Sequence, residues 1–143
     1  NLKRLNIISE VWHAKKGPSN ELLLDHGIKS KINQNIVSII PLQRNNIKNF
    51  LFLFLKLFRL FKLADEIIEN NADILHLNYN GLLLLCFLLK KKGYNKKIIV
   101  HSRTIFPNNF FGRIYSKLYN YTDANIFIST VEKKNIQKCL IKS

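Results

Sequence analysis

Short apolar runs that end in polar residues recur along this chain, and segments with helical spacing lie between them. The clearest runs cover residues 73–77, 97–101 and 124–128. Strands that are buried on both faces of a parallel sheet have this nearly continuous apolar character. Because strands and helices alternate, the pattern predicts an α/β fold with a doubly wound parallel sheet and right-handed connections.

Two weaker runs, residues 5–9 and 35–40, would complete a sheet of about five strands. Helices are expected where apolar residues recur every three or four positions, bounded by capping residues or glycines. Sheets of this kind bind ligands beyond the carboxyl ends of their strands. The expected helices cover residues 21–26, 46–70, 81–92 and 109–120, and a last helix follows the capping residues Ser129 and Thr130.

The long helix over residues 46–70 has two interpretations. An uncharged run, residues 50–55, precedes Lys56, Arg59 and Lys62, which are spaced three residues apart. The run is too short to span a bilayer, which takes about 20 apolar residues. The preferred interpretation is a helix packed on the sheet with its cations in water. The alternative is a helix at a membrane surface whose cations face acidic headgroups.

Composition narrows the function classes. The chain has 143 residues, 47% of them hydrophobic, which suits one globular domain with a real core. A formal net charge of +14 favours anionic partners such as nucleotide phosphates or acidic lipids. The basic residues are scattered and accompany no nucleic-acid motif, so no specific nucleic-acid partner is expected. Cys86 and Cys139 are isolated, which predicts neither a disulfide nor a metal site and fits a reducing cytoplasm.

Candidate chemistry lies at the expected carboxyl ends of the strands. His101, Ser102 and Arg103 follow one strand, and His76 and Asn78 end another. A histidine at such an edge could act as a general base or orient a sugar hydroxyl, and an arginine could hold a carboxylate or phosphate with two hydrogen bonds. For His76 we prefer a buried, hydrogen-bonded role.

Gly17 lies in the loop after the first strand, next to Pro18 and Ser19. This loop could present backbone N–H groups and a helix N-terminus to an anion, or it could be a simple turn. The glycine patterns of dinucleotide sites and P-loops do not occur, and neither does the G-x-S-x-G motif of hydrolases.

The order of these segments resembles the N-terminal domain of family 4 glycosyltransferases. The resemblance rests on the Gly17 loop, on residues 72–77, 97–103 and 122–129, and on Lys133 after the last of them. Members of this family are retaining, nucleotide-sugar-dependent enzymes with the GT-B fold. The resemblance therefore implies a Rossmann-like, acceptor-side domain over residues 1–143, from which the C-terminal donor-binding domain is missing.

The resemblance also implies roles for individual residues. Gly17 would approach the phosphate of the donor, and His101 would lie beside the reacting sugar as the catalytic residue. We assign Asn78, Ser102 and Arg103 to the acceptor, a saccharide or a lipid-linked sugar in cell-surface polysaccharide synthesis. No metal and no cofactor beyond the nucleotide-sugar co-substrate are expected.

The implied setting is the cytoplasm, at the inner face of an acidic membrane, and the chain is expected to be inactive without its second domain. Two alternatives stay open. A non-catalytic α/β binding module, such as a response-regulator-like domain, would need an acidic cluster after its first strand, where this chain has Glu10. A basic nucleic-acid-binding domain would bind DNA with a steep salt dependence.

Overall fold

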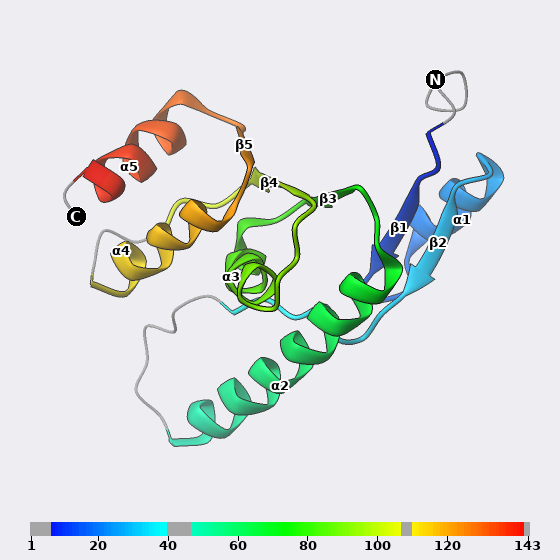
Figure 1. Cartoon of the computed structure of the whole chain (residues 1–143), viewed down its shortest axis with the longest axis horizontal. Helices are drawn as coiled ribbons and strands as arrows, with labels where there is room; N and C mark the ends of the chain where they lie inside the picture. Colours follow the sequence, from blue (N-terminus) through cyan, green and yellow to red (C-terminus); the bar gives the residue numbers. More distant parts are fainter. Residues whose placement is uncertain (1–6, 40–46, 107–109, 142–143) are drawn as a thin grey trace. The chain divides into compact units, whose positions relative to one another are not determined.

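A computed structural model describes residues 7–39, 47–106 and 110–141 of the chain (Figure 1). The fold divides into two compact units, residues 1–37 and residues 38–143. Each unit contains its own parallel sheet, so the predicted α/β class with parallel strands is confirmed.

The first unit is a single β-α-β element. Strand β1 (Glu10–His13) leads into helix α1 (Pro18–Asp25), and strand β2 (Lys29–Ile32) returns beside β1 in parallel register. Helix α1 ends before Gly27, whose φ of 66° lies in the left-handed region that glycine adopts at low cost. The predicted helix with Gly27 as its stop is therefore confirmed, with a start three residues earlier, at Pro18.

Both strands predicted for this part of the chain are displaced. Residues 7–9 are not a strand and residues 5 and 6 lie outside the described residues, while β1 begins at Glu10. The second prediction, residues 35–40, is wrong over its described part, residues 35–39. Asn33 forms a turn there, because its backbone oxygen accepts the Ile36 N–H (3.2 Å) and its side chain accepts the Asn35 N–H (2.9 Å). The strand β2 that does form is polar and half-exposed, so it has no apolar signature.

The second unit contains a three-stranded parallel sheet in the order β3-β4-β5. Leu77 pairs with Val100 at the end of β3, and Ser102 pairs with Phe127 at the end of β4. The elements are α2 (Ile47–Asn70), β3 (Ile74–Leu77), a 3₁₀ turn (Asn80–Leu82), α3 (Leu83–Lys91), β4 (Lys97–Ser102), α4 (Phe110–Ser116), a 3₁₀ segment (Lys117–Tyr121), β5 (Ala124–Phe127) and α5 (Thr130–Ile141). Each lies within a few residues of its predicted range.

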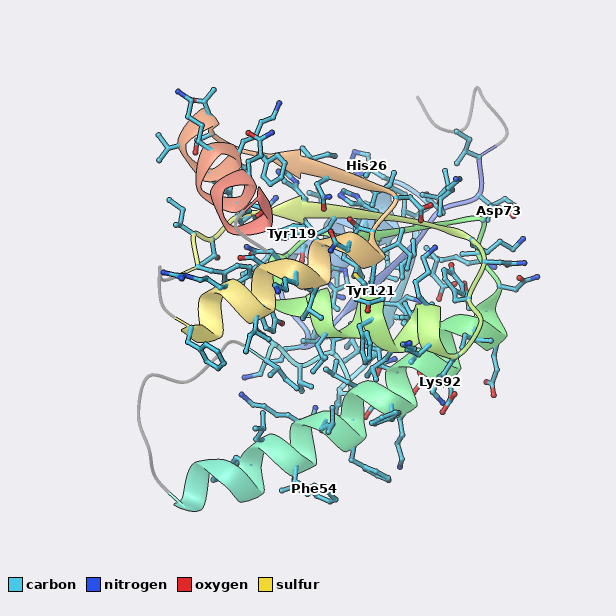
Figure 2. The ribbon with its side chains drawn as sticks, turned by 60° about the vertical axis from the view of Figure 1, so that its left-hand side comes forward. His26, Phe54, Asp73, Lys92, Tyr119 and Tyr121 are labelled. Atoms are coloured by element: carbon cyan, nitrogen blue, oxygen red, sulfur yellow. The ribbon has the colours of Figure 1, made fainter. Side chains whose placement is uncertain are left out.

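Helices α2, α3 and α4 lie on one face of this sheet (Figure 2). Ile98 and Val100 of β4 point to that face and are fully buried. Ile74 and Ile126 point to the other face and are 60% and 47% exposed. The order β3-β4-β5 advances in one direction, and right-handed connections then place every crossover helix on the same side. The structure thus has a sheet with one helical layer, where the sequence predicts helices on both faces.

The single sheet of about five strands is not seen, because the strands belong to sheets of two and three in separate units. A doubly wound sheet needs a reversal of strand order, at which the crossover helices change faces. The described strands of the second unit contain no such reversal. The interpretation of the runs as strands buried on both faces is wrong for β3 and β5.

Ion pairs join the strands at the amino edge of the second sheet. Asp123, just before β5, accepts the Ile98 N–H (2.9 Å) and pairs with Lys90 (3.1 Å) and Lys97 (3.4 Å). Asp73, just before β3, pairs with Lys96 (3.0 Å). The aspartates that open the two family-like segments therefore hold neighbouring strands together, at the edge opposite to the candidate site.

The Asp123 carboxylate makes stability depend on pH. The Ile98 N–H, together with Lys90 and Lys97, lowers the pKa of Asp123 below its usual 3.8. A lowered pKa stabilises the fold above 3.8, and this contribution is lost as the pH falls through the folded-state pKa. We expect Asp123→Asn to lower the melting temperature at neutral pH and to flatten its acid dependence below about pH 4. Melting curves across this range test this, with Glu69→Gln as the control. An unchanged acid slope in Asp123→Asn would contradict it.

Cys86 of α3 is fully buried and is not in a disulfide. Burial raises the pKa of its thiol to about 12, so the group stays protonated at neutral pH. Cys86 is therefore a small side chain of the core. The side chain of Cys139 lies outside the described residues.

Candidate functional site

Asn78, His101 and Arg103 gather at the carboxyl edge of β3 and β4. Leu77 and Val100 are the last pair between β3 and β4. Asn78 comes directly after β3, and His101, which still pairs with Ile126 of β5, is the next residue of β4. Asn78 and Arg103 are exposed and His101 is half-buried. The parallel register thus brings together three of the residues that the sequence assigns to the site.

His76 and His101 lie side by side on the open face of the sheet. Their rings are nearly parallel, at 14°, with centroids 6.2 Å apart. His76 pairs with Ile99, so it shares a face with His101, which is two residues further along β4. His76 is exposed, and the prediction of a buried histidine is wrong. The sequence contained a signal for this pairing of histidines, because position-by-position pairing of two parallel strands places both of them on one face.

Ser102 has a different position from its neighbours. It points to the covered face of the sheet and is fully buried. Its hydroxyl lies 2.6 Å from the Tyr119 hydroxyl and donates to Oε1 of Glu132 at 2.7 Å. An acceptor sugar would have to displace this network to reach Ser102. Ser102 therefore supports the edge from its covered face, whereas Asn78 and Arg103 are exposed there.

Glu132 is the centre of this buried network, and the sequence did not reveal its role. It is 1% exposed, and its second oxygen accepts the Ile128 N–H (3.3 Å). Its own N–H is donated to Oγ of Ser129 (3.2 Å), so Ser129 is the N-cap of α5. Glu132 thereby joins the end of β4, the end of β5 and the start of α5. The available signal was the spacing Ser129-x-x-Glu132, which is typical of a helix N-terminus.

A second buried contact joins the loops that follow β3 and β4. Nδ2 of Asn80 donates to the Thr104 carbonyl (2.6 Å), and Asn80 is fully buried. Gly81 accepts the Tyr115 hydroxyl (2.9 Å) through its carbonyl, and a side chain at Gly81 would collide with Ser38 and Tyr79. These contacts hold in place the backbone around Asn78 and Arg103.

In the first unit, Gly17 is the N-cap of α1. Its N–H is donated to Oδ1 of Asn20 (2.7 Å), and Pro18 has no N–H to offer. Its φ of −163° is extended backbone, and an added Cβ would meet no atom within 4 Å. The fold therefore does not require glycine here. Nε2 of His13, at the end of β1, is buried without a hydrogen-bond partner.

A family model described as Glycosyltransferase Family 4 matches residues 16–143. The chain belongs to glycosyltransferase family 4. This finding confirms the family inferred from the strand motifs, and the match includes Gly17, Asn78, His101 and Arg103. Comparison with curated proteins and with solved structures gives no significant match.

Two further findings concern ligands and membranes. Among the described residues of this glycosyltransferase domain, no group of three or more His, Cys, Asp or Glu side chains could hold a metal ion. No helix within the described ranges is long and apolar enough to cross a bilayer.

Proposed function

We propose that this chain is the acceptor-side domain of a retaining glycosyltransferase that moves a sugar from a nucleotide-sugar to a saccharide or lipid-linked acceptor. Membership of the family supports sugar transfer in general. The observation that carries the finer proposal is the edge at which Asn78 and Arg103 follow paired parallel strands and His101 lies one residue before the end of β4. Synthesis of a cell-surface polysaccharide, at the cytoplasmic face of a membrane, is part of the proposal.

His101 is the proposed catalytic residue. An imidazole beside the reacting sugar can accept a proton or orient a hydroxyl. Its ring is half-buried next to His76, which limits its rotation and keeps it at the edge. The family match favours this proposal over the non-catalytic module and the nucleic-acid-binding domain.

Arg103 and Asn78 are proposed to hold the acceptor. Arg103 is exposed and follows the buried Ser102, so its backbone is fixed while its guanidinium reaches solvent. A guanidinium binds a phosphate or carboxylate with two parallel hydrogen bonds, and the phosphate of a lipid-linked sugar is such a group. The Asn78 amide can donate to and accept from sugar hydroxyls.

Gly17 is proposed to approach the donor phosphate. The space around it supports this role, since no atom lies within 4 Å of the position of a Cβ. A phosphate would use other N–H groups of the α1 N-terminus or displace Asn20 from the Gly17 N–H.

Steady-state kinetics of the whole enzyme, with each substrate varied in turn, tests these two roles. We expect Arg103→Ala to raise the KM for an anionic acceptor about tenfold or more, because a charged hydrogen-bond donor is lost. We expect Gly17→Ala to raise the KM for the nucleotide-sugar severalfold, because a methyl group occupies the space of the phosphate. Each variant is the control for the other.

The proposal fails in two ways. Equal effects of both variants on both KM values would show that neither residue is specific for its substrate. A product whose anomeric configuration is inverted would contradict the retaining mechanism.

A further inference from the structure

The first turns of helix α2 lie toward the carboxyl edge of the second sheet and extend past it. Three residues link the end of α2 to the start of β3, so the helix runs back along the sheet, with its first turns toward the carboxyl edge (Figure 1). A helix of 24 residues is about 36 Å long, whereas four residues of β3 span about 13 Å. The first half of α2 therefore extends past the strand ends.

Among the α2 side chains that the structure describes, from Phe52 on, the buried ones lie in the second half of the helix. Leu60, Leu63, Ala64 and Ile67 are buried at helical spacing, and they pack α2 against its unit. The opposite side is formed by Phe54, Leu55, Phe58 and Phe61, which are 63%, 51%, 56% and 40% exposed. Figure 2 shows Phe54 pointing away from the unit. Lys62 projects from the same side and Arg59 from its border, and we call these six side chains the α2 outer face.

Cations and acidic residues lie in separate segments of this helix. Residues 52–64 contain three cations and no Asp or Glu, and acidic residues begin at Asp65. Nζ of Lys62 lies 4.9 Å from the centre of the Phe58 ring. Lys62 thus lies next to an exposed aromatic ring of the outer face.

We infer that the α2 outer face docks on a lipid surface with acidic headgroups. Aromatic and leucine side chains would enter the boundary between headgroups and acyl chains, and the cations would face the headgroup phosphates. A second copy of the chain fits this face poorly, because cations would meet cations and each copy has a formal net charge of +14. The preferred interpretation from the sequence, a helix whose packed face leaves only a basic stripe in water, does not account for the exposed phenylalanines.

Docking through α2 would also set the position of the proposed site relative to the membrane. The outer face and the edge with His101 and Arg103 belong to the same unit and lie toward the same end of its sheet. A domain held on the membrane through α2 would bring that edge near acceptors that are anchored in the bilayer. Lipid docking itself does not require that the proposed catalytic roles be correct.

Flotation of the purified protein with vesicles tests the inference. Vesicles of phosphatidylcholine with phosphatidylglycerol are compared with phosphatidylcholine alone. We expect binding to the acidic vesicles, and we expect added salt to weaken it. The combined change Arg59→Gln and Lys62→Gln should weaken binding about fivefold for each cation removed. Phe54→Ser with Phe58→Ser should weaken it by roughly tenfold for each ring.

Matched controls come from the first unit. Leu22→Ser with Leu24→Ser removes two exposed apolar side chains, each 61% exposed. Lys15→Gln with Lys16→Gln removes two exposed cations. Both sets should retain most of the binding, which excludes a general effect of net charge or hydrophobicity.

Three results would overturn the inference: no binding of the unchanged protein, equal loss in the variants and the controls, or a dimer that Phe58→Ser dissociates. The last would assign the α2 outer face to a second copy of the chain. Transfer to a water-soluble acceptor provides the separate readout. If the α2 variants lose vesicle binding but keep this activity, docking and catalysis are separate. If a folded variant loses both, they are not independent.

Discussion

Replacing His101 by alanine should lower kcat by about a hundredfold or more while the KM values change little. The expected effect is large because the ring lies near the end of β4, at the edge of the sheet where the proposed site is. A group that acts on the reacting sugar contributes mainly in the transition state, so its loss appears in turnover rather than in substrate affinity.

A second variant separates the two roles open to this histidine. His101→Asn retains a hydrogen-bonding side chain but cannot take up a proton, so recovery of activity would indicate orientation of a hydroxyl. Activity as low as that of His101→Ala would indicate proton transfer. His26→Ala changes an exposed histidine at the end of α1 and is the control. A near-normal kcat for His101→Ala would remove His101 from the mechanism.

Glu132→Ala should destabilise the second unit by about 2–3 kcal/mol, or roughly 10 °C in melting temperature. The change leaves two donors, the buried Ser102 hydroxyl and the part-buried Ile128 N–H, without the Glu132 carboxylate as acceptor. A truncated partner costs more than a hydrogen bond contributes where the remaining group is buried, as Ser102 is. Thermal unfolding followed by circular dichroism measures the effect.

A double-mutant cycle attributes this cost to the network. Ser102→Ala in the Glu132→Ala background should destabilise less than Ser102→Ala alone, because the partner is already absent. Glu69→Ala removes an exposed carboxylate near the end of α2 and should change the melting temperature little. Strictly additive effects of Ser102→Ala and Glu132→Ala would show that the buried contact is not an energetic unit.

The sequence predicted the second unit better than the first. The runs at 73–77, 97–101 and 124–128 became β3, β4 and β5, because buried strands need several apolar residues in succession. The strands of the first unit were harder to predict, because they do not contain such apolar runs. Strand β2 is a polar segment in a two-stranded sheet, and the apolar residues 36–39 follow a turn and are not a strand.

The site was predicted in part. Since strand ends are visible in the sequence, Asn78, His101 and Arg103 could be placed at one edge. The burial of Ser102 and the exposure of His76 could not be assigned, because each depends on which face of the sheet the helices cover. Glu132 was missed because its partners Ser102 and Ile128 come from other parts of the fold.

By itself, the sequence determined the α/β class, the strands of the second unit and the family, since these depend on local periodicity and on short motifs in a fixed order. The tertiary structure decided which side chains are available for chemistry. Strands that advance in one direction through right-handed crossovers place their helices on a single face, and this turns Ser102 inward and leaves His76 beside His101. The exposed phenylalanines of α2 were likewise not evident, because the length of helix that the sheet covers is a property of the assembled fold.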